Sequence, residues 1–146
     1  YGPWGRPDMA PMIFVKSILE KKSINVFNNG DMRRDFTYID DIIEALYRCC
    51  LKIPFIDSND VNNNLAPYRI FNIGSGRPIN LMDFIDILEK NLNLKAEKNY
   101  LPIQKGDVKE TYADTSNLMK WINYSPVINI ELGIEKFIKW YKNYYL

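Results

Sequence analysis

Residues 24–41 read INVFNNGDMRRDFTYIDD, and this stretch decides the fold class of the chain. Its apolar start predicts a short strand, and the Asn-Asn-Gly-Asp run at 28–31 is a strong turn signal. The residues from Arg34 onward predict an extended approach to a helix that Asp40 or Asp41 caps. Adjacent carboxylates diverge around a helix, so a cap is a better interpretation than a metal or acid/base pair.

The same alternation of strands and helices continues on both sides of this stretch. A turn-rich loop over 1–8 precedes a helix that Asp8 caps and that runs to about residue 22. The polar run at 57–67 predicts a loop, and 68–73 predict a strand that stops at Gly-Ser-Gly. Further elements are expected as helices over 81–92, 114–121 and 130–144 and a strand around Tyr100. This order indicates a mixed α/β or α+β fold in one domain, residues 1–146.

The composition excludes several classes of function. Nineteen Lys and Arg against eighteen Asp and Glu leave a net charge of +1, which provides no general attraction to nucleic acid or to an anionic membrane. No apolar run approaches the ~18 residues of a membrane span, and no secretory signal opens the chain. The adjacent Cys49 and Cys50 are poorly placed for a disulfide, which favours a reducing cytoplasm.

Catalytic signatures are missing from the chain. There is no histidine, so histidine-based acid/base chemistry and histidine metal sites are excluded, and no metal site is expected. Gly2 and Gly5 have Gly-x-x-Gly spacing, but Asp8 follows where a dinucleotide fingerprint needs a third glycine. No tyrosine is followed by a lysine four positions later. No catalytic residue is therefore predicted.

Arg34 is the strongest candidate for a ligand-binding residue. Its guanidinium offers a rigid fork of donors that suits phosphate or carboxylate oxygens, and it lies just after a turn, where a side chain can be aimed into a cleft. The alternative is that Arg33 and Arg34 form surface ion pairs with the flanking Asp31 and Asp35.

Two weaker candidates accompany it. The backbone of Val26 and Phe27 can present a donor and an acceptor to a flat ring such as uracil, although a core strand is the simpler interpretation. Asp107, after Gly106, can accept hydrogen bonds from sugar hydroxyls, or it is a turn aspartate that satisfies its own backbone.

Five motifs in order give the chain a family resemblance: YGPWGRPDMAPMIF, VFNNGDMRRDFTYIDDI, FNIGSG, GDVKETYADTS and LGIEKFIKWY. They resemble the C-terminal part of extended short-chain dehydrogenases/reductases that act on nucleotide sugars, and most of all the UDP-glucuronate 4-epimerase group. The resemblance implies a Rossmann-type protein whose N-terminal half, with the NAD loop and the Tyr-x-x-x-Lys residues, is not in this chain. It also implies inversion at C4 of a UDP-hexuronate or UDP-hexose through transient oxidation by NAD, with this chain inactive alone.

The resemblance assigns roles position by position. Arg34 is implied to clamp the pyrophosphate, and Asp107 to meet the ribose. Val26 and Phe27 are implied to flank the uracil. Gln104 stands where galactose-type relatives have a second phosphate-binding arginine, which implies weaker anion binding.

The opening motif carries the remaining assignments. Asp8 and Met9 are implied to approach the UDP group from the start of their helix. Tyr1 is implied to lie by the nicotinamide of NAD. Arg6 is implied to face a uronate carboxylate.

Several alternatives stay open. A dehydratase or decarboxylase of the same superfamily, or a stand-alone nucleotide-sugar-binding or interaction module without catalysis, would present similar residues. The family context suggests polysaccharide assembly and a homodimeric parent. Because the chain begins with Tyr1 and not Met, it is expected to be a piece, a processed product or an engineered segment. The resemblance further implies that the FNIGSG stretch and its neighbouring helix pack on the N-terminal half, so this chain alone is expected to expose apolar surface and to self-associate or be only marginally stable.

Overall fold

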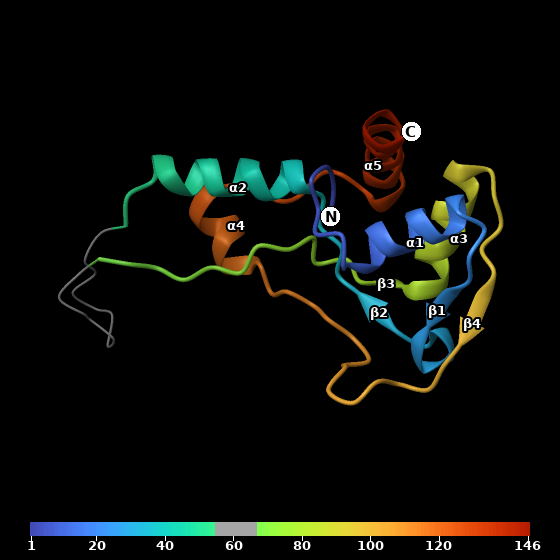
Figure 1. Cartoon of the computed structure of the whole chain (residues 1–146). Helices are drawn as coiled ribbons and strands as arrows, with labels where there is room; N and C mark the ends of the chain where they lie inside the picture. Colours follow the sequence, from blue (N-terminus) through green and yellow to red (C-terminus); the bar gives the residue numbers. More distant parts are fainter. Residues whose placement is uncertain (55–66) are drawn as a thin grey trace.

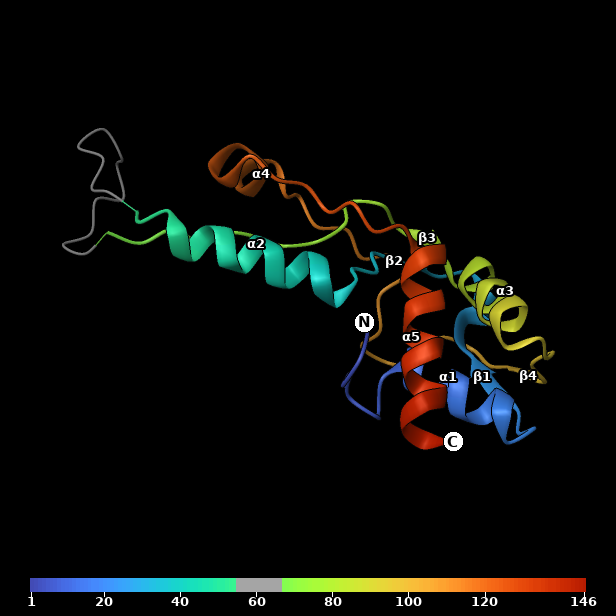
Figure 2. The same cartoon turned by 90° about the horizontal axis from the view of Figure 1, so that it is seen from above.

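The computed structural model describes residues 1–54 and 67–146, and Figures 1 and 2 show a packed body from which an arm extends. The predicted loop at 57–67 lies almost entirely outside the described residues. The fold is mixed α/β, as the order of strand and helix signals predicts.

Two small sheets form one side of the body (Figure 1). β1 (Ile24–Val26) pairs in parallel with β4 (Lys98–Tyr100), with Ile24 opposite Lys98. β2 (Arg33–Arg34) pairs antiparallel with β3 (Ile79–Asn80), and Arg33 also forms a parallel bridge with Glu110. The turn predicted at 28–31 exists as a single 3₁₀ turn, η1 (Phe27–Gly30), in which both asparagines have positive φ.

Three helices pack against each other and the strands to make the core. They are α1 (Ala10–Leu19), α3 (Leu81–Leu92) and α5 (Ile130–Tyr145). Their buried residues recur at helical spacing, so each helix turns one apolar stripe inward. The main contributors are Phe14, Val15, Ile18, Phe84, Ile85, Leu88, Ile134, Phe137 and Ile138.

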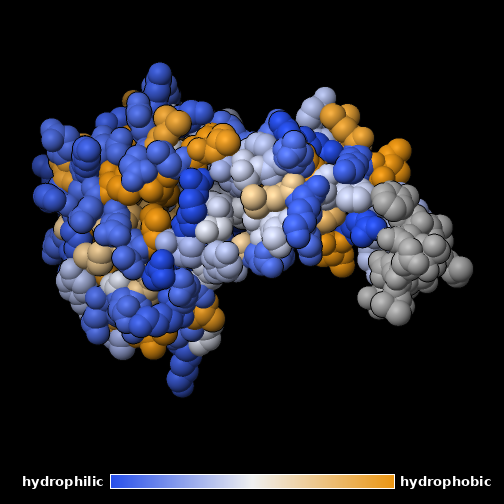
Figure 3. Space-filling view, turned by 180° about the vertical axis from the view of Figure 1, so that it is seen from behind, coloured by the Kyte–Doolittle hydropathy of each residue, from blue (hydrophilic) through white to orange (hydrophobic). Residues whose placement is uncertain are grey.

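The arm consists of α2 (Ile39–Leu51), α4 (Ser116–Ile122) and the extended segments that join them to the body. Its own core is small and centres on Ala45, Leu118 and Ile122. On α2, the apolar side chains of Ile43 and Leu46 are exposed. Figure 3 shows hydrophobic side chains gathered on this arm.

Both predicted aspartate caps are wrong. Met9 occupies the N-cap of α1, which ends at Leu19, and Asp8 pairs with Arg6 instead. Tyr38 occupies the N-cap of α2. In each case the aspartate is engaged by another partner and is not available to the helix end.

Asp41 does not cap α2 but binds the segment that precedes α5. Its buried carboxylate accepts hydrogen bonds from the Tyr124 hydroxyl at 2.6 Å and from the backbone N–H groups of Val127 and Ile128 at 3.1 and 3.0 Å. These bonds attach the base of α2 to the segment that leads into α5.

The strand predicted at 68–73 is also not formed. These residues are extended, but within the described residues no strand pairs with them. A strand needs a neighbour to receive its backbone hydrogen bonds, and local pattern cannot supply one.

Candidate functional site

The side chain of Arg34 contacts Asp107, although the two residues are 73 positions apart in the sequence. Arg34 Nη2 lies 2.8 Å from Asp107 Oδ1. Arg34 Nη1 donates to the carbonyl oxygens of Arg33 at 2.8 Å and Lys109 at 3.2 Å. The two residues that the resemblance assigns to phosphate and ribose therefore form one unit.

Backbone pairing sets the register of this unit. The Arg33 N–H donates to the Lys109 carbonyl at 2.9 Å, and the Thr111 N–H donates to the Arg33 carbonyl at 3.2 Å. Segment 107–111 therefore runs beside β2 as a further strand-like partner. Backbone pairing holds the two segments side by side, and the side chains of Arg34 and Asp107 meet across them.

Arg34 does form an ion pair, as the alternative predicts, but its partner is Asp107 and not the flanking Asp31 or Asp35. Asp31 pairs with Lys109 at 2.7 Å. Asp35 accepts from the Ser75 hydroxyl and from the backbone N–H groups of residues 76 and 113, at 3.0 and 3.2 Å for the backbone donors. Asp35 thus connects the end of β2 with residues 75–76 and 113, and it does not pair with Arg34.

Asp107 fits the prediction of a turn aspartate. Its Oδ1 accepts from the Val108 N–H at 2.8 Å, as a turn aspartate does, and it also accepts from Arg34. Its own N–H donates to the Gln104 carbonyl at 3.1 Å, so Gln104 lies at the start of the same turn. The exposed Gln104 side chain is thereby placed on the loop that supplies Asp107.

Val26 belongs to the core strand, as the simpler interpretation predicts. It is fully buried, and its carbonyl accepts from the Leu101 N–H at 3.0 Å, so its backbone acceptor is already engaged. Phe27 follows in η1 and packs partly buried against the main core. The Asn29 N–H donates to the Leu101 carbonyl at 3.1 Å, which connects this turn to the loop that leads to Gln104.

A second group of predicted residues lines a cavity of about 290 Å³. Tyr1, Arg6 and Met9 are in its wall, together with Phe36, which follows Arg34 by two positions. Asp8 is not in the wall, and its carboxylate pairs with Arg6 at 2.5 Å on the surface. The remaining lining is mostly apolar and consists of Gly2, Gly5, Pro11, Met12 and Phe137.

Tyr1 is held from several sides. Its ring meets those of Phe36 and Tyr38 edge-on, with centroids 6.1 and 5.4 Å away. Its hydroxyl donates to the Ile130 carbonyl at 3.5 Å. Burial, with nearby negative charge, raises the pKa of this phenol well above its ordinary value.

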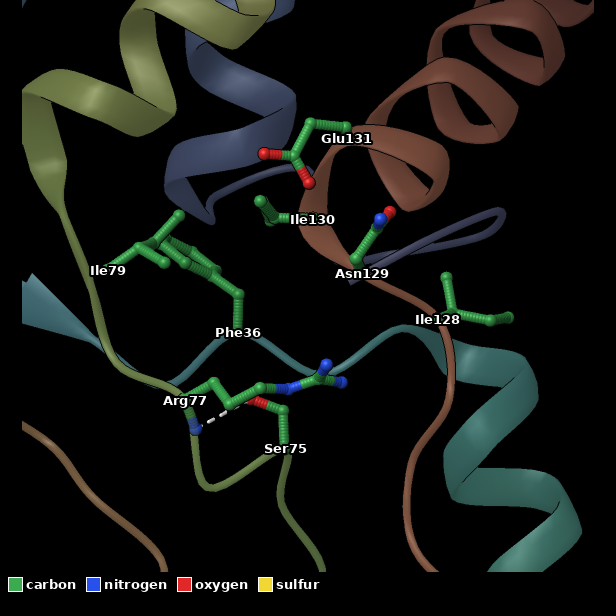
Figure 4. A pocket seen from close by; sticks show the side chains of 8 residues that line it. All are labelled: Phe36, Ser75, Arg77, Ile79, Ile128, Asn129, Ile130 and Glu131. Carbon is green, nitrogen blue, oxygen red and sulfur yellow. Dashed lines mark hydrogen bonds between the residues drawn. The ribbon is translucent and has the colours of Figure 1, made fainter.

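Sequence reasoning missed a smaller cavity of about 220 Å³ where the body meets the arm (Figure 4). Phe36, Ser75, Arg77 and the start of α5 surround it. Its polar groups serve local structure: Arg77 donates to the Pro126 carbonyl at 3.2 Å, and Asn129 accepts from the Leu132 N–H at 2.9 Å. No local sequence motif predicts this cavity, because it forms only where residue 36, residues 75–79 and residues 128–131 come together in the fold.

Residues 1–54 and 67–146 contain no group of three or more His, Cys, Asp or Glu side chains that could together hold a metal ion. Among the helices described there, none combines the length and apolar character needed to cross a bilayer.

Comparison with known proteins decides the family. The model of the NAD dependent epimerase/dehydratase family matches residues 1–74, just over half of the chain. The chain belongs to this family. It is 44% identical over 151 residues to Protein CapI of Staphylococcus aureus, covering 99% of this chain and 45% of that protein.

Two further proteins are similar to this chain, one in sequence and one in both sequence and structure. The chain is 41% identical over 156 residues to UDP-glucuronate 4-epimerase 1 of Arabidopsis thaliana, covering 99% of this chain and 35% of the relative. UDP-glucuronic acid 4-epimerase from Bacillus cereus, solved in complex with UDP-glucuronic acid and NAD, matches with a TM-score of 0.83 and 34% identity over 99% of this chain and 43% of that one. This member of the epimerase family thus spans less than half the length of these relatives.

Proposed function

We propose that this chain is the nucleotide-sugar-binding part, in the C-terminal region, of an NAD-dependent 4-epimerase that acts on a UDP-hexuronate. The contact of Arg34 with Asp107 carries the proposal. It brings a donor fork for a diphosphate and an acceptor for ribose hydroxyls to the same edge of the sheet. The Bacillus cereus relative, whose structure holds UDP-glucuronic acid, supports the class of ligand.

The cavity of about 290 Å³ that Tyr1, Arg6, Met9 and Phe36 line is the proposed place for the sugar. Its apolar wall suits a sugar ring, and Arg6 is the cation in its lining. Arg6 is proposed to face the uronate carboxylate, and Met9 to contact the nucleotide from the start of α1. Asp8 pairs with the Arg6 guanidinium on the surface.

NAD supplies the transient oxidation at C4 in the proposed reaction. The residues of this chain do not form a dinucleotide site by themselves, because no glycine-rich fingerprint is present. Tyr1 is proposed to border the nicotinamide with its ring. The catalytic base and most of the NAD contacts are proposed to belong to another part of the full-length enzyme.

Titration with UDP tests the proposal. Arg34→Ala is expected to weaken UDP binding about tenfold or more, since a charge-assisted hydrogen bond contributes ~1.5–3 kcal/mol. Arg33→Ala is the matched control. Arg33 is the neighbour of Arg34 on β2, its guanidinium pairs with Glu110 at 3.1 Å, and it has no assigned role toward the ligand. Calorimetric titration that gives Arg34→Ala the same UDP affinity as the parent chain would refute the assignment.

A further inference from the structure

The guanidinium of Arg34 is already committed within the protein. Its Nη1 donates to two backbone carbonyls, and its Nη2 donates to the Asp107 carboxylate at 2.8 Å. The two side chains retain 23% and 32% of their exposure, so a ligand can reach the pair from solvent. Because a guanidinium has five N–H donors, these three hydrogen bonds leave room for a diphosphate, which must bind beside the negative charge of Asp107.

The two contacts of Arg34 have separate roles. The carbonyls of Arg33 and Lys109 hold Nη1, and they are themselves fixed by the backbone pairing of β2 with segment 107–111. The position of the guanidinium thus does not require Asp107. What Asp107 adds is a negative charge beside the donors that a phosphate would use.

The charges around this site are balanced by three ion pairs. Arg33 pairs with Glu110, Arg34 with Asp107, and Lys109 with Asp31. An incoming anion therefore meets a neutral surface and a carboxylate 2.8 Å from Arg34 Nη2. Removal of the Asp107 charge alone leaves a local excess of one positive charge directly at Arg34.

We propose that Asp107 is a specificity-determining counter-ion, which makes diphosphate binding at Arg34 conditional on the ribose. In a nucleoside diphosphate, the ribose hydroxyls donate to the Asp107 carboxylate and partly offset its negative charge, which lowers its repulsion of the diphosphate at Arg34. An anion without ribose hydroxyls meets the full charge of Asp107. This inference rests on the proposed function and adds to it a reason for rejecting simple phosphates.

The experiment titrates the 146-residue chain with inorganic pyrophosphate, UDP and 2′,3′-dideoxy-UDP. Asp107→Asn keeps the shape of the side chain and removes its charge. This variant is expected to bind pyrophosphate about fivefold more tightly, which corresponds to the ~1 kcal/mol of a partly exposed ion pair. It is also expected to lose most of the parent's preference for UDP over the dideoxy nucleotide.

Glu110→Gln is the matched control, because it removes the neighbouring carboxylate without touching Arg34. It is expected to leave both the pyrophosphate affinity and the preference for UDP as in the parent. Equal gains in pyrophosphate affinity for the two variants, or an undiminished preference for UDP in Asp107→Asn, would overturn the counter-ion role. Thermal unfolding of each variant verifies that the chain is folded in the titration.

Arg34→Ala separates the two ideas. If it loses UDP binding while Asp107→Asn changes neither measurement, the proposed function stands and the counter-ion role is refuted. If Arg34→Ala binds UDP as the parent does, or if the parent binds neither UDP nor pyrophosphate, the proposed function is refuted, and the counter-ion role is refuted with it.

Discussion

The acid sensitivity of the fold is expected to depend on Glu89, whose carboxylate is almost completely buried at 3% exposure. It accepts hydrogen bonds from the ammonium groups of Lys95 and Lys98 and, at 3.1 Å, from the Ala96 N–H. This network connects the end of α3 to β4, which is the partner of β1. Loss of the network therefore affects the sheet beside the proposed ligand site.

The magnitude follows from the pKa of this carboxyl. Burial by itself raises the pKa of Glu89, but the hydrogen bonds from Lys95, Lys98 and Ala96 outweigh it and lower the pKa from 4.5 to about 2. At about 1.36 kcal/mol per pKa unit, this difference contributes about 3 kcal/mol to stability. Because the pKa is lower in the folded chain, the contribution is complete above about pH 5 and is lost as the pH falls toward 2.

Urea denaturation of the parent and of Glu89→Gln at several pH values between 7 and 3 measures this effect. Near neutral pH the variant is expected to be less stable by about 3 kcal/mol, and the difference is expected to shrink as the pH falls. Other carboxyl groups contribute to acid unfolding in both chains, so the difference between the two isolates Glu89.

The two lysines provide an internal control. Lys95 is 86% exposed and Lys98 is 19% exposed, so solvent screens the first ion pair and not the second. Lys98→Ala is expected to cost more stability than Lys95→Ala. Parallel pH profiles for the parent and Glu89→Gln, or a larger loss for Lys95→Ala, would refute the reasoning.

Three further predictions concern packing. Gly133→Ala is expected to lower the melting temperature, because an added Cβ would lie 1.9 Å from the Tyr1 hydroxyl oxygen; a higher melting temperature, as helix propensity alone predicts, would contradict this packing. Asp41→Ala is expected to cost ~2–4 kcal/mol in urea unfolding, since the Tyr124 hydroxyl and two backbone N–H groups lose their acceptor; a change under 0.5 kcal/mol argues against this anchor. The exposed apolar side of α2 is expected to cause self-association, which Leu46→Glu reduces, and sedimentation that shows a stable monomer for the parent would oppose it.

The elements that the sequence predicts well depend on local signals. The turn at 28–31, α3 and α5 form where the pattern places them, because turn residues and helical spacing act over a few neighbours. The caps by Asp8 and Asp41 fail for the opposite reason. Arg6 engages Asp8, and the segment that includes Tyr124 engages Asp41, so the partner that decides each position is not the adjacent helix end.

The candidate site divides in the same way. Arg34 and Asp107 are recognisable as ligand-type residues from their chemistry and their neighbours, but nothing in the sequence states that they touch. The backbone of Val26 is expected to face the uracil ring, but its carbonyl oxygen already accepts a hydrogen bond from the Leu101 N–H. A sequence can indicate which groups are available, but hydrogen-bond partners far along the chain determine which of them remain available.

By itself the sequence determined the mixed α/β class, the family resemblance, the lack of histidine chemistry and the identity of the charged groups around Arg34. Those properties reside in residue types and short spacings. The tertiary structure alone decided that Asp107 neutralises Arg34 and that the apolar side of α2 remains uncovered in this chain. Both depend on segments that are distant in sequence and adjacent only in the folded chain, where backbone pairing sets their separation.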